Sequence, residues 1–362
     1  MIVCDEEHVI ERCLRSAAPF ITTYCICYNG TGSGKTKDII RKVMYERNIK
    51  GVIHDHTWEE FGPTRTKAFQ ASREHCPNGW SWVIDADDTI VGDPPSEQYW
   101  SNIPENVTHM NVKIEHGALR HHRPQLFRNS FEWKYKRRIH ETPVLDDVPN
   151  VVLTLPETVR HVVFCEGVRS LDPLKYIKDA NRAKLDYLDD PKDGRSIYYL
   201  AQCYRDAQLY GESIKWYKLR AEIGDQARHE QYLACVEIIY HAVDIKEQLR
   251  YTWKALDIDG TRLEAPGWML GIAVTKNHFT SEVLAIGNYV KQREPLPEHI
   301  FTNMEIYDWK YADSFSVVLF WKGLYAQSLA ESRRALLKCP EGHRERIGKN
   351  VQYAYDKLHP KK

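Results

Sequence analysis

The 362-residue sequence has no excess charge of either sign, because 50 lysines and arginines balance 50 aspartates and glutamates. Such a chain has no overall field that attracts nucleic acid or an anionic membrane. Mean hydropathy is −0.54, and no apolar run approaches the roughly 18–20 residues that a membrane helix needs. The residues before the first acidic ones do not have the pattern of a signal peptide, so we expect a cytoplasmic protein without a membrane span.

Paired cysteines are also lacking. The nine cysteines are scattered, odd in number and without a Cys-x-x-Cys spacing. That spacing is typical of zinc sites and of redox motifs. We therefore expect no zinc site, and free, mostly buried thiols in a reducing compartment.

A complete phosphate-binding loop is the third absence. The stretch YNGTGSGKTKDII, Tyr28–Ile40, resembles the P-loop pattern G-x-x-x-x-G-K-[ST], whose glycines let backbone amides face phosphate. Gly34, Lys35 and Thr36 supply its second half, but Asn29 stands where the first glycine belongs. No acidic strand of the Walker B kind lies at a matching place. An ATPase is therefore disfavoured.

Strand-like and helix-like segments alternate up to about residue 158. Five short segments have the composition of strands: residues 1–3, 23–28, 51–55, 80–85 and 109–115. Three segments carry apolar residues at helical spacing: residues 6–17, 36–48 and 64–75. This alternation predicts an α/β domain with a mostly parallel sheet covered by helices. Such sheets bind ligands at the carboxyl ends of their strands.

From about Asp172 onward the pattern changes to helix after helix. Leu200-Ala201, Tyr204, Ser213 and Tyr217 fall at the offsets of a tetratricopeptide repeat of about 34 residues. A second, weaker copy spans about residues 229–260, with Trp253 and Ala255. A later copy places Leu319, Ser328, Ala335 and Pro340 at the same offsets. A generic helical bundle with chance spacing is the alternative. Agreement in more than one copy favours repeats.

The most informative stretch is VIDADDTI, Val83–Ile90. An apolar segment ends abruptly in Asp85, Asp87 and Asp88, and strand alternation would place the first two on the same side. Neighbouring carboxylates repel unless a cation joins them or their pKa rises. Mg²⁺ and Mn²⁺ take oxygen ligands and complete their shell with phosphates. The motif predicts a metal–diphosphate site, with a solvated acidic turn as the alternative.

Together with other segments, this motif resembles the inverting glycosyltransferases of family 2, which have the GT-A fold. D-A-D-D is similar to their D-x-D motif, and MIVCDEEHVIERCLRS (1–16) to their opening strand and helix. FGPTRTKAFQASREH (61–75) is similar to their F-G-x-x-R-N-x-A helix. RPQLFRNSFEWKYKRRIHETP (123–143) is similar to their R-L-F-R-N…H-E segment, with Gln125 in the arginine's place. The resemblance covers about residues 1–165, and members often append tetratricopeptide repeats.

The resemblance implies a metal-dependent enzyme that moves a hexose from a nucleotide-diphosphate sugar to a hydroxyl. The donor that it implies is a UDP-sugar. The acceptor would be a glycan, a protein or another hydroxyl-bearing molecule. Asp85 and Asp87 would bind Mn²⁺ or Mg²⁺ and the donor diphosphate, with His140 as a third metal ligand. Arg65 would contact the donor nucleotide, and Glu141 would be the general base, with Asp88 as the next candidate.

The glycine loop occupies the place of the family's D-T-G-S-T-D-G-T. Tyr28 and Ser33 stand where its two aspartates belong, which departs from the usual recognition of uridine. We expect Tyr28 to stack on the base and Asn29 to hydrogen-bond to it. Two aromatic residues, Trp133 and Tyr135, are candidates either for stacking on a sugar ring or for packing.

We therefore predict a GT-A domain with a Rossmann-like mixed sheet over residues 1–168. An all-α, tetratricopeptide-like domain would follow over residues 169–362. The repeats would recruit an acceptor or a protein partner, or form a homodimer. The alternative is a binding scaffold whose first domain has lost catalysis, which the altered Tyr28 loop favours.

Overall fold

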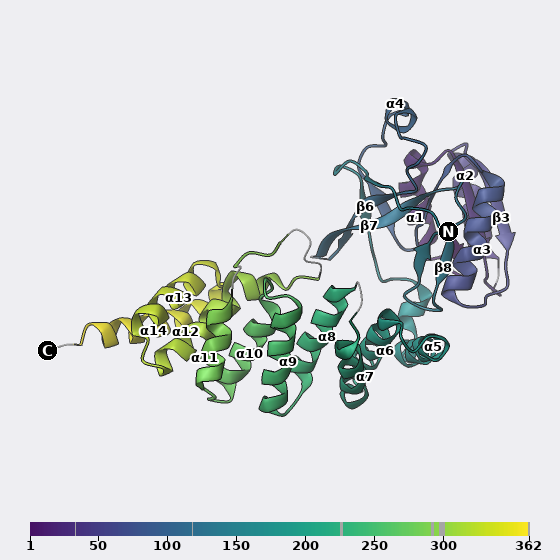
Figure 1. Ribbon diagram of the computed structural model, residues 1–362. Coiled ribbons are helices and arrows are strands. Elements are labelled where there is room, and N and C mark those ends of the chain that lie inside the picture. The colour runs from purple at the N-terminus through teal and green to yellow at the C-terminus, as the bar shows by residue number, and fades with distance from the viewer. Residues whose placement is uncertain (33, 118, 225–226, 291–292, 297–300, 361–362) are drawn as a thin grey trace. The chain divides into compact units, whose positions relative to one another are not determined.

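The computed structural model describes residues 1–360 except 33, 118, 225–226, 291–292 and 297–300 (Figure 1). The chain forms two compact units, Met1–Asp186 and Tyr187–Lys362. This division lies beyond the 168/169 boundary expected from the sequence, because helix α5 (Lys175–Asp189) is tied to the first unit. Its Asp186 pairs with Arg138 at 2.8 Å. We describe each unit by itself.

The first unit opens with a three-stranded parallel sheet of order β1-β2-β3. Its strands are β1 (Ile2–Val3), β2 (Thr23–Tyr28) and β3 (Lys50–Asp55). The helices of this region are α1 (Ile10–Ala17), the 3-10 turn Ala18–Phe20, α2 (Lys35–Glu46) and α3 (Phe61–His75). Apolar residues of α1, α2 and β2 form one buried cluster, which includes Ile10, Ile26 and Ile40. The alternation expected from the sequence is confirmed here.

The second sheet of this unit is mixed and mostly antiparallel, with the order β4-β7-β6-β11-β5, and β10 also pairs with β6. Its strands are β4 (Trp80–Trp82), β5 (Thr89–Val91), β6 (His109–His116), β7 (Leu119–Arg128), β10 (Val152–Thr154) and β11 (Arg160–Val162). The remaining elements are α4 (Glu97–Ser101), the hairpin β8 (Lys134–Lys136) and β9 (Thr142–Val144), and the 3-10 turn Val168–Leu171. A mostly parallel sheet was therefore wrong for this half, because short connections such as that between β6 and β7 reverse the chain.

The strand expected over residues 80–85 ends at Trp82. Asp85 and Asp87 lie beyond it in a turn, in which the N–H of Asp88 donates to the carbonyl of Asp85 at 3.2 Å. Strand alternation therefore does not set the directions of these aspartates. The turn and its partners do.

The helices of the second unit are its only regular secondary structure among the described residues. Its elements are α6 (Gly194–Asp206), α7 (Tyr210–Glu222), α8 (Arg228–His241), α9 (Ile245–Ile258), α10 (Glu264–Thr275), α11 (Ser281–Tyr289), the π-turn Ile306–Lys310, α12 (Tyr311–Trp321), α13 (Tyr325–Lys338) and α14 (Glu341–Leu358). Consecutive helices lie side by side in Figure 1. In the described part of the chain, no helix is both long and apolar enough to cross a membrane.

Two helix pairs of this unit repeat the same hydrogen bonds. The Ser213 hydroxyl of α7 donates to the carbonyl of Ala201 in α6 at 2.9 Å. The Ser328 hydroxyl of α13 donates to the carbonyl of Ser316 in α12 at 2.8 Å, again twelve residues back. Both turns pass through a left-handed residue, Gln208 or Gly323. The pairs are copies of one structural unit, which confirms the expected helical repeats.

Candidate functional site

Arg65 on α3 joins two of the acidic residues singled out from the sequence. Its Nη2 lies 2.7 Å from Oδ1 of Asp85, and its Nε lies 2.6 Å from Oε1 of Glu141. The side chains of Arg65 and Glu141 are 14% and 13% exposed, whereas that of Asp85 is 50% exposed. The folded chain thus brings the turn after β4, the middle of α3 and the segment before β9 to one place.

The charges of this cluster support one another. Desolvation by itself would lower the pKa of Arg65, but the Asp85 and Glu141 carboxylates outweigh it and raise that pKa. Desolvation would likewise raise the pKa of Asp85, but the Arg65 guanidinium holds it below its usual value. Arg65 therefore stays a cation, and Asp85 stays a carboxylate at neutral pH.

Asp87 is held by the chain that follows β11. Its Oδ2 accepts the N–H groups of Glu166 and Gly167 at 2.9 and 3.0 Å, and its carbonyl accepts from Arg12 at 2.8 Å. Among the described residues, Oδ1 of Asp87 accepts no hydrogen bond. One oxygen of this carboxylate is thus fixed by the protein, and the other can take a ligand.

Asp88 has a different role from its neighbours. Its side chain is 2% exposed, and Oδ2 lies 2.7 Å from Nε2 of the fully buried His161, while Oδ1 accepts the N–H of Phe164. Desolvation raises the pKa of Asp88, although the hydrogen bond to His161 opposes the rise. The Gln125 amide lies 3.0 Å from the other ring nitrogen of His161. Asp88 holds the turn in place and is too enclosed to meet an acceptor.

A metal site with three protein ligands is not assembled among the described residues, because no group of three or more His, Cys, Asp and Glu side chains is suitably placed. His140 lies just before β9 with a left-handed φ of 49°. Mg²⁺ commonly uses one or two carboxylates and completes its shell with substrate phosphates. Oδ1 of Asp87 fits such a shell, whereas Asp85 already pairs with Arg65. Metal binding by Asp85, Asp87 and His140 stays a prediction.

Tyr28, at the end of β2, is 5% exposed. Its hydroxyl donates to Oδ1 of Asp5 at 2.5 Å, and this bond raises the pKa of Tyr28 to about 12. The Lys37 ammonium lies 4.5 Å from the ring centroid. Before a base could stack on Tyr28, Lys37 would have to leave that face. Asn29 donates its N–H to the carbonyl of Val3.

Asp5 was not singled out from the sequence, although its place two residues beyond the carboxyl end of β1 is a usable signal. The glycine loop lies directly over it: a Cβ on Gly30 would be 2.3 Å from its Oδ1. Ser33 lies outside the described residues. Thr36, the threonine of the P-loop-like stretch, is buried, accepts the N–H of Glu6 and donates to Glu7 at 3.1 Å. Its hydroxyl therefore bonds within the protein, to Glu6 and Glu7.

The two aromatic residues before Glu141 pack in the interior. Trp133 is 4% exposed, and its ring centroid lies 4.9 Å from that of Phe127. Tyr135 stacks on Phe69 at 5.1 Å. Of the two roles left open from the sequence, packing is the observed one, because the β8–β9 hairpin folds onto α3.

The sequence matches no protein-family model and no curated protein. Among solved structures, the chain is similar to a thermophilic TPR protein of Thermus thermophilus, at 14% identity. The match covers 49% of this chain and 91% of that protein, with a TM-score of 0.29. So low a score supports no argument, and the helical repeats rest on their own hydrogen bonds.

Proposed function

We propose that the first unit is a metal-dependent inverting glycosyltransferase, which moves a hexose from a nucleotide-diphosphate sugar to a hydroxyl. The observation that carries the proposal is the Arg65 bridge between Asp85 and Glu141. It sets a cation between two carboxylates just beyond the carboxyl end of β4. Loops beyond strand ends are where α/β sheets bind their ligands.

Each residue of the cluster has a task in this reaction. Glu141, oriented by Arg65, accepts the proton of the acceptor hydroxyl as the sugar is transferred. Arg65 faces the donor phosphates and offsets their charge. Oδ1 of Asp87 would hold Mn²⁺ or Mg²⁺, with Asp85 as the second carboxylate. The ion would stabilise negative charge on the leaving diphosphate.

Three single variants of the full chain test this proposal through the release of nucleoside diphosphate from UDP-sugars and other nucleotide sugars with Mn²⁺. Glu141→Gln keeps shape and should lower turnover by about 10²–10⁴-fold without weakening the binding of donor. Asp87→Asn should weaken Mn²⁺-dependent binding of donor. Asp93→Asn, a change at an exposed aspartate of the same unit, is the control. If no nucleotide sugar is bound or cleaved by the unaltered protein, the transferase proposal fails.

A second candidate is the scaffold, in which the helical repeats bind a protein and the first unit no longer catalyses. The observation that favours it is that the two expected metal-ligating carboxylates already bond to protein groups. Asp85 pairs with Arg65, and Asp87 accepts hydrogen bonds from two backbone amides. A scaffold would show no thermal stabilisation by any nucleotide sugar, with or without Mn²⁺. The same screen therefore separates the two candidates.

A further inference from the structure

Glu141 follows directly after a turn with an uncommon backbone. The turn, residues 137–140, joins β8 to β9, and its first and last residues, Arg137 and His140, have left-handed φ values of 74° and 49°. Residues other than glycine seldom adopt this conformation, and it persists where the surrounding structure holds it in place. The direction in which Glu141 leaves the turn therefore depends on the groups that hold residues 137–140.

The buried carboxylate of Asp186, on α5, holds the centre of this turn. Its Oδ2 accepts the backbone N–H of Arg138 at 2.9 Å, and its Oδ1 accepts from the Arg138 guanidinium at 2.8 Å. The side chain of Asp186 is 7% exposed, so water competes little for these bonds. Desolvation raises the pKa of Asp186, and hydrogen bonds from Arg138 and from the backbone of Ile139 oppose the rise. One carboxylate thus holds the two residues that lie between the left-handed ones.

The first turn of α3 also contacts residues 137–140. Gly62 lies so close to the carbonyl oxygen of Arg137 that a Cβ at this position would overlap it. Arg65 follows three residues further along the same helix, and its Nε lies 2.6 Å from Oε1 of Glu141. The turn that precedes Glu141 and the cation that pairs with it therefore both pack on, or belong to, one helix.

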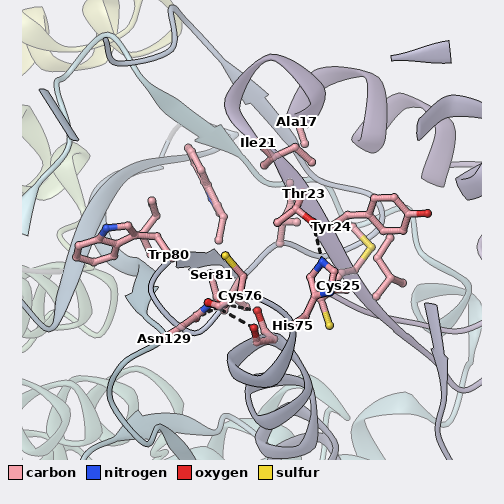
Figure 2. Close-up of a pocket in the computed structure, with 18 of the residues that line it drawn as sticks. Ala17, Ile21, Thr23, Tyr24, Cys25, His75, Cys76, Trp80, Ser81 and Asn129 are labelled. Carbon is pink, nitrogen blue, oxygen red and sulfur yellow. Dashed lines mark hydrogen bonds between the residues drawn. The ribbon is translucent and has the colours of Figure 1, made fainter. Parts of the chain in front are cut away.

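Helix α3 is itself anchored at its C-terminal end. In Figure 2, His75 of α3 bonds to Thr23 of β2, with 2.7 Å between its Nε2 and the hydroxyl oxygen. The amide of Asn129, just after β7, donates to the carbonyl of Cys76 at 2.8 Å. The helix is thus bonded to both sheets of the first unit, so the guanidinium of Arg65 has a fixed place. Whether Glu141 meets it depends on the turn.

We propose that Asp186 is a positioning residue for Glu141: by holding residues 137–140, its carboxylate sets the side chain of Glu141 against Arg65. The inference rests on the proposed transferase function, in which Glu141 is the general base. Asp186 acts through the turn, because its own oxygens are occupied by Arg138. Loss of its charge therefore misplaces the base and lowers turnover, while the binding of donor stays as it is.

The first test compares Asp186→Asn with Asp179→Asn in the full chain. Both carboxylates are buried on α5, but Asp179 pairs instead with Arg169 and Arg182. We expect Asp186→Asn to lower kcat about tenfold or more, a part of the loss that removing a general base causes, with an unchanged KM for the donor. Asp179→Asn should keep its kcat. The double variant Asp186→Asn/Glu141→Gln should be as slow as Glu141→Gln alone, because a base that is absent cannot be misplaced.

A second pair of variants displaces the turn without altering Asp186. Gly62→Ala places a methyl group against the carbonyl of Arg137. Gly211→Ala is its control at the second residue of α7, where a Cβ would meet open space among the described residues. Gly62→Ala should lower kcat and keep the KM for the donor, whereas Gly211→Ala should change neither. Because Gly62→Ala moves the same turn, it keeps the role of the turn testable if Asp186→Asn fails to fold.

A stability cycle tests the placement of Glu141 without any activity. Glu141→Gln removes the charge that pairs with Arg65, so its cost in unfolding free energy, measured in urea, reports that pair. The cost should fall to about half or less in the Asp186→Asn background and stay the same in the Asp179→Asn background. An unchanged cost, or equal kcat values for Asp186→Asn and Asp179→Asn, would overturn the proposal. If the unaltered protein transfers no sugar, the transferase proposal fails, and the stability cycle alone decides whether Asp186 places Glu141.

Discussion

At the scale of single residues, we expect Arg65 to contribute most to the stability of the site, because its largely buried guanidinium pairs with two carboxylates. Arg65→Ala leaves Glu141 enclosed without its counter-charge. Removing one partner of a buried pair costs about 3–5 kcal/mol. Because Asp85 is half-exposed and solvent screens its charge, we expect a smaller loss in unfolding free energy, of about 2–4 kcal/mol. Urea unfolding measures it. Arg73→Ala, which loses an exposed pair at 3.8 Å, should cost less than ~0.5 kcal/mol. Equal losses would contradict a structural role for the bridge.

Asp85 gives a prediction about pH. Its pKa in the folded protein is below the unfolded value, so the native state binds fewer protons than the unfolded chain in that range. Stability from its ionisation is present above the unfolded pKa of about 3.9 and is lost as pH falls through the folded pKa. The gap in unfolding free energy between the unaltered protein and Asp85→Asn should therefore narrow from pH 6 to pH 3. A gap that stayed constant would show that Asp85 does not sense Arg65.

The grouping of Arg65, Asp85 and Glu141 could be anticipated from the order of the segments that carry them, but the role of each carboxylate could not. Asp85, Asp87 and Asp88 are near neighbours in one motif. They bond, respectively, to a guanidinium, to two backbone amides and to a buried histidine. Those partners lie 20 to 80 residues away along the chain. A local pattern therefore gives the chemical type of the residue, and the fold decides its partner.

At the scale of elements, the positions of strands were easier to predict than their directions. All five expected strands of the first unit are present, because their apolar and β-branched residues are local signals. The antiparallel order β4-β7-β6 was not expected. The mostly parallel sheet came from assuming that each crossover carries a helix, whereas β6 and β7 follow one another directly. Short strands such as β8 and β9 carried too few residues to be recognised.

The repeated serine bonds of the second unit allow a matched test. Ser213 and Ser328 are 1% and 2% exposed and bond to the preceding helix in the same way. Each change to alanine removes one buried hydrogen bond and should cost about 1 kcal/mol in unfolding free energy. Ser281→Ala, at an exposed position, is the control and should cost less than ~0.5 kcal/mol. If only one of the two buried serines matters, the hairpins are not energetically equivalent copies.

At the scale of the whole molecule, the two units have separate buried clusters. In the first unit, Ile26 and Ile40 belong to one cluster and Met110 and Val112 to another. The second unit has its own clusters around Tyr232 and around Met269. Since a domain with its own core can unfold on its own, calorimetry of the full chain should resolve two transitions. The isolated segment 190–362 identifies the helical transition.

A nucleotide sugar with Mn²⁺ should then act on one transition only. If donor binds at Asp87 and Arg65, the first unit gains about 2.7 kcal/mol at a ligand concentration 100 times the Kd, and its melting temperature rises while the helical transition stays in place. Asp87→Asn should abolish most of that rise. If the melting temperature of the helical transition rose instead, the ligand would bind to the helical repeats and not to the first unit. A third outcome is a shift of the first transition that persists in Asp87→Asn but disappears in Arg65→Lys. Donor would then bind at Arg65 without the help of Asp87. Lysine cannot replace Arg65 there, because it lacks the planar fork that can hold a phosphate and a carboxylate together.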